Sequence, residues 1–292
     1  MRYVTYSGPG GTRAAGVIDG EAIRPFAGSL TLEAFIAFDA AGRARALGAL
    51  GSAVPRSSVR LLAPLAPKKN VFCVGRNYLA HAAEGARALG KTLELPPVPT
   101  FFTKAPTAVA GPEQTLRLQA SVSPQYDWEA ELALVIGTTC KDVSEADALD
   151  VVFGYTCLND VTARDLQRLH GQWFKGKSLD DTCPLGPWIV EAADIADPQN
   201  LQVRLRVNGV EKQSASTATM IFTCRTIIAQ LSRGMTLEPG DIIATGTPEG
   251  VGFARTPPEF LADGDVMEVE IEGIGILRNA VQIAALAGAA RT

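Results

Sequence analysis

The stretch that decides the fold is Leu201-Gln202-Val203-Arg204-Leu205-Arg206-Val207-Asn208-Gly209. Its apolar residues alternate with polar ones, and a period of two is typical of a strand with one buried face. Asn-Gly follows the last apolar residue at once, and this dipeptide favours the tight turn of a β-hairpin. The stretch therefore predicts a strand that turns back on itself.

Other strands are predicted by the same alternation, and helices are fewer. Met267, Val269 and Ile271 alternate with glutamates, which predicts a second strand with one face in water. The i, i+1, i+4 spacing within Ile227–Leu231 predicts a helix that ends before Pro239-Gly240. Strands do not alternate with helices as a doubly wound sheet demands, and no fixed-period repeat is visible. The predicted class is α+β, dominated by β.

The N-terminal part of the chain predicts a small β-rich unit. Short strands are expected at Tyr3–Tyr6 and Ala15–Ile18, with a turn at Gly8–Gly11 between them and a brief helix near Leu32–Ala37. Two prolines and two lysines mark Ala63–Lys69 as a boundary. We therefore expect a small domain over residues 1–66 and a larger catalytic domain over residues 67–292.

Composition excludes several classes of function. The chain has 292 residues, 47% of them hydrophobic and 20% charged, so it is long enough to bury a sizeable core. A net charge of -4 gives no electrostatic footprint for nucleic acid or an anionic membrane. Five scattered cysteines suggest neither a disulfide framework nor a zinc site. With no apolar run of signal-peptide or membrane-spanning length, the expectation is a soluble cytoplasmic protein.

A pair of carboxylates lies in Tyr126-Asp127-Trp128-Glu129-Ala130-Glu131-Leu132-Ala133-Leu134-Val135-Ile136-Gly137. The second half of this stretch is apolar and β-branched, which predicts a strand. Glu129 and Glu131 are two residues apart and would face the same way. Two carboxylates aimed at one point repel each other, and a hard divalent cation relieves that repulsion. The alternative is a solvated polar face on an edge strand.

A third acid, Asp160, ends the apolar run Val151–Asn159 and precedes the helix-like Ala163–Gln167. The end of a buried strand is a common place for a functional side chain. Asp160 is equally placed to be the N-cap of the following helix, and taken alone it favours the cap.

Three further segments suggest chemistry. His81 and Glu84 have i, i+3 spacing, so on a helix they form either an acid/base dyad or a weak surface pair. Phe174-Lys175-Gly176-Lys177-Ser178 offers lysines that either bind an oxyanion or are simply solvated. The glycine-rich run Gly240–Gly252 can offer backbone N–H groups and the Thr247 hydroxyl to a substrate carboxylate. It lacks the Lys-Ser/Thr of a nucleotide-binding loop. His170, the second histidine, is expected at a helix end.

Five motifs together resemble the fumarylacetoacetate hydrolase family in order and spacing, over roughly residues 70 to 280. They are Gly75-Arg76-Asn77-Tyr78 with His81 and Glu84, Glu129-Ala130-Glu131, Asn159 to Asp165, Lys175-Gly176-Lys177-Ser178, and Thr245 to Gly252. The resemblance points to the branch of acylpyruvases and 2-hydroxyhepta-2,4-diene-1,7-dioate isomerases. Trp128 stands where relatives often have tyrosine.

The resemblance implies the fold, the roles of the residues and the assembly. It implies a mixed β-sandwich or roll, a homodimer, and Mg²⁺ or Mn²⁺ bound by Glu129, Glu131 and Asp160. His81 and Glu84 would lie in a lid and activate water, and Lys177 would stabilise negative charge on the substrate. Arg76, Gln167 and Thr247 would bind the substrate, a small 2-oxo or diketo acid.

The reaction expected first is hydrolysis of a carbon-carbon bond in a 1,3-diketo acid such as an acylpyruvate or fumarylpyruvate, giving pyruvate and a carboxylic acid. A metal bound to the 2-oxo carboxylate stabilises the enolate that leaves, and the His/Glu pair activates water. The same site would serve decarboxylation of an oxaloacetate-like acid, tautomerisation of a hydroxymuconate-like dienol, or hydration of a dienoate. An inactive binding or scaffold protein that keeps the fold is the alternative of another class.

Overall fold

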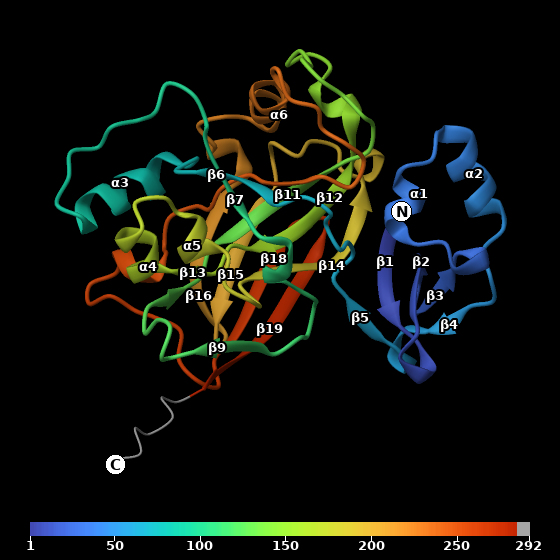
Figure 1. Cartoon of the computed structure of the whole chain (residues 1–292), viewed down its shortest axis with the longest axis horizontal. Coiled ribbons are helices and arrows are strands. Elements are labelled where there is room, and N and C mark those ends of the chain that lie inside the picture. The colour runs from blue at the N-terminus through green and yellow to red at the C-terminus, as the bar shows by residue number, and fades with distance from the viewer. Residues whose placement is uncertain (285–292) are drawn as a thin grey trace.

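The computed structural model describes residues 1–284. A twelve-stranded mixed sheet forms the centre of the fold (Figure 1). Across the sheet the strands run β4 (Val54–Pro55), β3 (Ala22–Pro25), β2 (Arg13–Asp19), β1 (Arg2–Ser7), β14 (Cys183–Glu191), β12 (Val152–Asn159), β11 (Ala130–Ile136), β17 (Ile242–Ala244), β6 (Val71–Gly75) and β7 (Thr100–Lys104). Two short strands are added to it, β5 (Arg60–Leu62) on β1 and β8 (Val109–Ala110) on β14.

A second sheet packs against the centre of the first. It runs β16 (Val210–Ser216), β15 (Gln202–Val207), β18 (Val266–Ile271), β19 (Gly275–Ala284) and β9 (Leu116–Gln119), and a two-stranded ribbon joins β10 (Tyr126–Asp127) to β13 (Thr162–Ala163). The helices are α1 (Leu32–Ile36), α2 (Ala40–Gly48), α3 (Leu79–Ala88), α4 (Arg164–Leu169), α5 (Phe174–Lys177) and α6 (Cys224–Ser232). With 36% strand and 24% helix, the α+β class dominated by β is confirmed.

The alternation in the sequence places the two cores. Along β11, Leu132 and Leu134 pack with Val203 and Leu205 of β15 between the two sheets. Alanine and valine at the intervening positions face the other side, where Phe35 of α1 closes a second core. Because β11 is covered on both faces, every one of its residues is buried, Glu131 included.

The predicted hairpin is confirmed. β15 pairs antiparallel with β16 through Val207 and Val210, and the two turn residues both have positive φ, 53° at Asn208 and 76° at Gly209. That geometry is the type I′ turn that Asn-Gly favours. The strand at 266–271 and the helix at 224–232 also form where their patterns predict them.

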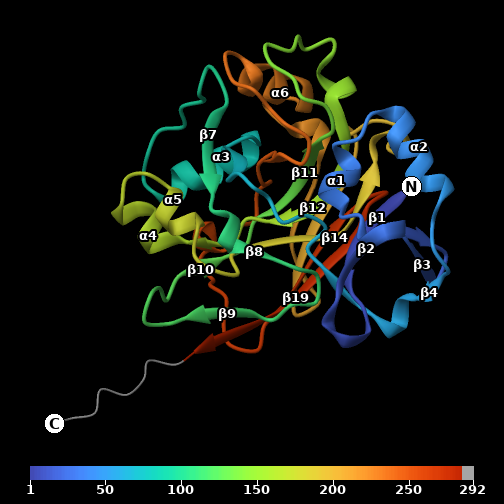
Figure 2. The same cartoon turned by 45° about the vertical axis from the view of Figure 1, so that its right-hand side comes forward.

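The strands before residue 66 extend the same sheet as those after it. β1 pairs with β14 through Arg2 with Val190 and Tyr3 with Ile189. In Figures 1 and 2 these N-terminal strands stand at one end of the molecule, away from α3, α4 and α5. The division into two domains at residue 66 stays a prediction. Within residues 1–284, no helix combines the length and apolar character needed to cross a membrane.

Candidate active site and metal centre

Strand pairing brings the three predicted carboxylates together. β11 and β12 pair through Ala130 and Asn159, and one step further the Asp160 N–H donates to the Glu129 carbonyl (2.8 Å). Residues opposite each other across a ladder face the same side, so Asp160 joins Glu129 and, two residues along, Glu131. One oxygen from each of the three lies within 4.8 Å of the others, and all three side chains are buried.

Asp160 is therefore not a helix cap, and that prediction from the local sequence is wrong. The helix after it, α4, begins at Arg164 with Ala163 in the N-cap position. Pairing with a strand some thirty residues earlier outweighs the local capping signal, because it sets which way the side chain points.

Three buried cations surround the carboxylates. Lys177 Nζ lies 2.6 Å from Glu129 Oε2 and 2.7 Å from Asp160 Oδ2. Lys104 Nζ contacts the other oxygen of Asp160 at 2.8 Å, and Arg164 Nη2 contacts Glu129 Oε1 at 2.7 Å. The alternative that the lysines of 175–177 are simply solvated is wrong for Lys177, which is 2% exposed, whereas Lys175 is exposed.

The charges shift the pKa of each group in a definite direction. Burial opposes the ionisation of Glu129, but Lys177 and Arg164 outweigh it and lower its pKa to about 2. Burial, with Asp160 and Glu129 close by, raises the pKa of Glu131 well above its usual range. Burial opposes the charge on Lys177 too, yet Asp160 and Glu129 raise its pKa. Two of the three carboxylates are thus already neutralised by ammonium and guanidinium groups, and Glu131 is the one short of positive charge.

The donor set fits a hard divalent cation. Carboxylate oxygens are the ligands that Mg²⁺ and Mn²⁺ prefer, and the three here converge on one point. Gly246 N–H donates to Glu131 Oε2 (2.7 Å) and fixes that side chain, but this single bond supplies no counter-charge. A fourth acid, Asp127, is outside the cluster, so four buried carboxylates face three buried cations.

The predicted acid/base dyad is formed at the opposite wall. His81 and Glu84 lie on α3, with Nδ1 of His81 3.0 Å from Oε1 of Glu84. Both side chains are about nine-tenths buried, so the alternative of a weak surface pair is wrong. Glu84 also accepts hydrogen bonds from Gly250 N–H (2.9 and 3.0 Å), which ties α3 to the glycine-rich loop. The remaining histidine, His170, follows the last residue of α4 as expected.

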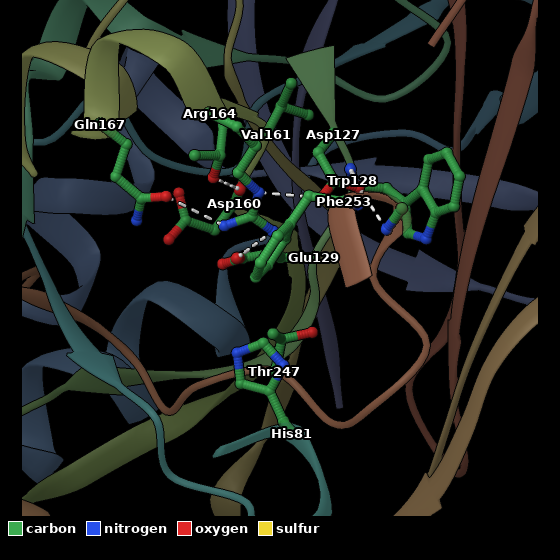
Figure 3. A network of polar contacts seen from close by, with 12 residues as sticks. His81, Asp127, Trp128, Glu129, Asp160, Val161, Arg164, Gln167, Thr247 and Phe253 are labelled. Atoms are coloured by element: carbon green, nitrogen blue, oxygen red, sulfur yellow. Dashed lines mark hydrogen bonds and ion pairs between the residues drawn. The ribbon is translucent and has the colours of Figure 1, made fainter. Parts of the chain in front are cut away.

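A cleft of about 650 Å³ connects the dyad to the carboxylates. It is lined by seven of the nine predicted site residues, namely Arg76, His81, Glu129, Glu131, Gln167, Lys177 and Thr247. Glu84 and Asp160 are behind this surface and contact His81 and Lys177, respectively. Figure 3 shows Arg164 between Glu129, Gln167 and Asp127, with His81 and Thr247 below Glu129. All nine residues thus belong to one site, and their individual roles stay predictions.

The glycine-rich loop differs from expectation in one respect. The sequence predicts that its backbone N–H groups receive a substrate carboxylate, but those of Gly246, Gly250 and Gly252 donate to the protein's own Glu131, Glu84 and Asp127. The loop therefore positions side chains of the site.

The comparisons with known proteins agree with this geometry. The family model for the fumarylacetoacetate (FAA) hydrolase C-terminal domain matches residues 70–282, well over half of the chain. This chain belongs to the fumarylacetoacetate hydrolase family. The resemblance of its five motifs is thus confirmed, and members of this family generally use divalent metals.

Relatives within the fumarylacetoacetate hydrolase family are similar to the chain over most of its length. Oxaloacetate tautomerase YisK of Bacillus subtilis is 49% identical over 226 residues, which cover 77% of this chain and 74% of that protein. Human mitochondrial oxaloacetate tautomerase FAHD2A is 43% identical over 239 residues, 81% of this chain and 74% of that protein.

Solved structures of the family share the whole fold. A fumarylacetoacetate hydrolase from Exiguobacterium antarcticum superposes with a TM-score of 0.84 at 41% identity, covering 97% of this chain and all of that one. A 2-hydroxyhepta-2,4-diene-1,7-dioate isomerase from Mycobacterium marinum gives 0.78 at 39% identity, covering 97% and 98%. The chain is therefore an enzyme of this family.

Three residues of the site were missed in the sequence: Lys104, Asp127 and Arg164. Asp127, Glu129 and Glu131 occur at two-residue spacing next to an apolar strand, and such a row of acids cannot be buried without cations. The row of acids therefore predicts that buried cations accompany it, but it does not identify which lysines or arginines they are. Lys104 ends an ordinary strand, and nothing in its neighbourhood distinguishes it from a surface lysine.

Proposed function

We propose that this chain catalyses keto-enol interconversion of a dicarboxylic 2-oxo acid of the oxaloacetate type, with Mg²⁺ or Mn²⁺ bound by Glu129, Glu131 and Asp160. The observation that supports it most is a single cleft with an acid/base dyad on one wall and a buried carboxylate cluster on the other. The printed names of the two relatives above, both oxaloacetate tautomerases, favour the same reaction.

The outer part of the cleft suits a second carboxylate. Three cations, Arg76, Lys91 and Arg168, line it together with one exposed acid, Glu94. Within residues 1–284 none of the three cations forms an ion pair with a carboxylate. Cations without acidic partners at the mouth of a cleft attract an anionic substrate and hold its charged end. A dianionic acid fits this charge distribution better than a substrate with a neutral tail.

Within the cleft the substrate's 2-oxo carboxylate is placed by residues of the chain. Arg164 and Gln167 present N–H donors, Thr247 a hydroxyl, and Lys177 an ammonium where negative charge develops on the keto oxygen. When bound, a divalent cation adds Lewis-acid stabilisation of that charge.

His81 moves the proton. Glu84 accepts from the Nδ1 side of the ring, which favours the tautomer with a free Nε2. Nε2 takes a proton from C3, and the electron pair of that C–H bond forms the C2–C3 double bond. The His81 imidazolium then gives this proton up, directly or by exchange through water, and the keto oxygen gains one as the enol forms. The reverse sequence regenerates the ketone, so the reaction needs no co-reactant.

Hydrolysis of a 1,3-diketo acid is the second candidate. The same His81 can take a proton from water, which then attacks the distal carbonyl, and the similar Exiguobacterium structure is of a fumarylacetoacetate hydrolase. Decarboxylation of oxaloacetate and isomerisation of a dienol would use the same residues. A binding protein without activity would instead show weak Mg²⁺ affinity and tolerate Glu131→Ala.

One panel of assays separates these reactions. The full-length chain is loaded with Mg²⁺ or Mn²⁺ and given oxaloacetate, an acylpyruvate and fumarylpyruvate. Loss of enol absorbance, release of pyruvate and release of CO₂ are followed in parallel. Fast keto-enol equilibration of oxaloacetate without matching CO₂ or pyruvate supports the proposal. Release of pyruvate from the diketo acids, with no faster decay of the oxaloacetate enol, would contradict the tautomerase proposal and support hydrolysis instead.

A further inference from the structure

Asp127 is a fully buried carboxylate that belongs to the site but not to the metal cluster. Its Oδ1 accepts from the N–H groups of Trp128 (2.8 Å) and Gly252 (2.7 Å). Its Oδ2 accepts from Arg164 Nε (2.8 Å) and Phe253 N–H (3.0 Å). Four donors saturate the acceptor capacity of a carboxylate, so Asp127 has no lone pair left for a ligand in the cleft.

Asp127 fixes the orientation of the Arg164 guanidinium, which forms part of one wall of the cleft. The Nε–H of the guanidinium donates to Asp127 and Nη1–H donates to Gln167 (3.2 Å), while Nη2 forms an ion pair with Glu129 (2.7 Å). The Phe253 ring covers the guanidinium face at 4.4 Å. A planar guanidinium contacted at all three nitrogens and on one face cannot rotate without breaking these contacts. Figure 3 shows Arg164 among these partners.

Through the turn Gly250–Phe253, Asp127 also reaches the dyad. The last two residues of the turn donate their N–H groups to Asp127, and the first, Gly250, donates its N–H to Glu84. A Cβ at Gly252 would lie 2.1 Å from the Glu259 carbonyl and 2.7 Å from Asp127 Oδ1, so the turn packs closely against Asp127 and leaves no space for a side chain. Four residues of chain therefore connect the carboxylate that fixes Arg164 to the carboxylate that orients His81.

We propose that Asp127 is a positioning residue that holds the His81–Glu84 dyad at a fixed distance from the acidic cluster. It acts through the Gly250–Phe253 turn on one side and through Arg164 on the other. This inference rests on the proposed function, because it takes His81 as the base that acts on the substrate. It assigns a role to a fully buried carboxylate of the site that lies outside the acidic cluster.

Asp127→Asn tests the inference with almost no change of shape. An amide can still accept at its oxygen, but its NH₂ group then faces N–H donors on the other side, so one pair of contacts is lost. We expect kcat for oxaloacetate enolisation to fall about 10- to 100-fold, the effect of a displacement near 1 Å. The Kd for Mn²⁺, measured by calorimetry, should change by a smaller factor than kcat, because Asp127 is linked to Glu129 only through Arg164 and is not itself in the acidic cluster.

A double-mutant cycle distinguishes positioning from a general loss of structure. If Asp127 acts through the dyad, Asp127→Asn should cost little further activity once Glu84→Gln has already released His81. Additive losses would overturn the inference. Asp181→Asn is the matched control, because Asp181 also accepts a backbone N–H, from Arg117, and a side-chain N–H, from Gln114, yet it lies outside the cleft.

Amide hydrogen exchange gives a readout independent of activity, so that failure of the inference and of the proposed function can be told apart. Asp127→Asn should speed exchange in α3 (Leu79–Ala88) and leave α2 (Ala40–Gly48), at the other end of the molecule, as in wild type. Unchanged exchange in α3 would overturn the inference even if the wild-type chain enolises oxaloacetate. Should Asp127→Asn not fold, Trp128→Phe replaces it, because it removes the indole N–H that donates to the Gly250 carbonyl (3.1 Å) and loosens the same turn.

Discussion

At the scale of single residues, a substitution of His81 can separate the contribution of proton transfer from that of metal binding. Its ring lines the cleft and contacts Glu84, but it is not among the carboxylates that converge on one point. We expect His81→Ala to lower kcat by about 10²- to 10⁴-fold, the usual contribution of a general base. The Mn²⁺ Kd should not change. Steady-state kinetics and calorimetry on one preparation measure both quantities.

The only other histidine is the control for this prediction. His170→Ala alters the residue after α4, outside the cleft, and should leave kcat at the wild-type value. Equal turnover by the His81 variant and the His170 variant would remove the dyad from the mechanism.

Glu131 and Glu129 should have opposite effects on stability without metal. Because the pKa of Glu131 is raised, the folded chain binds that proton more tightly than the unfolded chain, whose carboxyl titrates near about 4.3. Stability in EDTA therefore falls as pH rises from the unfolded value toward the folded one. Glu131→Gln keeps the acceptor for Gly246 and removes this loss. At pH 8 its Tm should exceed that of the wild type, by about 2–4 °C for each kcal/mol regained.

Glu129 has a lowered pKa, about 2, so its ionised form stabilises the folded chain above the unfolded pKa and that contribution is lost as pH falls through the folded value. Glu129→Gln should therefore lower Tm at pH 8, where Glu131→Gln raises it. Thermal unfolding of both variants in EDTA makes the comparison. A Glu131→Gln variant less stable than the wild type at pH 8 would show that another cation compensates the charge.

At the scale of elements, the segment after β17 positions Glu131 through the N–H of Gly246. Comparing Gly246 with Gly240 separates the cost of backbone strain from the cost of close packing. Gly246 has φ of +97°, and a Cβ there would lie 2.7 Å from Asn77 Cβ and 3.0 Å from the Val74 carbonyl. Gly240 has φ of +90° with nothing within 4 Å. We expect Gly240→Ala to cost about 1 kcal/mol from strain alone. Gly246→Ala should cost about 1–3 kcal/mol more from overpacking.

Urea unfolding measures both costs, and metal titration adds a functional readout. Only Gly246→Ala should weaken Mn²⁺ binding, because only Gly246 donates its N–H to Glu131. Equal stabilities of the two alanine variants would mean that the neighbours of Gly246 move aside without cost.

Elements with a local pattern could be predicted from the sequence, and contacts between distant elements could not. The β15–β16 hairpin follows from alternation and Asn-Gly, and the His81–Glu84 pair from helical spacing. The partners of Asp160 could not be predicted, because Lys104 lies 56 residues away along the chain. The direction in which the Asp160 side chain points depends on the register between β11 and β12, and no local sequence signal encodes that register.

At the scale of the whole molecule, the family resemblance implies a homodimer, and self-association of this chain stays a proposal. The described surface exposes several large apolar side chains, among them Phe101 on the edge strand β7 and Leu169 at the end of α4. Exposed apolar residues are common on single chains as well, so their presence does not by itself define an interface.

Cooperativity of unfolding is the property that the sheet as a whole determines. The N-terminal strands join the main sheet through β1 and β14, and Tyr3 packs on Phe35 (ring centroids 5.3 Å apart) and on Phe153 (5.0 Å). The core at this junction contains side chains from both sides of residue 66, so neither part can unfold without exposing the other's apolar surface. We expect one calorimetric transition in which the measured and van't Hoff enthalpies agree. Tyr3→Ala should lower its midpoint, because loss of a buried aromatic side chain costs about 3–5 kcal/mol, without splitting the transition. Two transitions in the wild-type chain, with only the earlier one moved by Tyr3→Ala, would instead establish residues 1–66 as an independent domain.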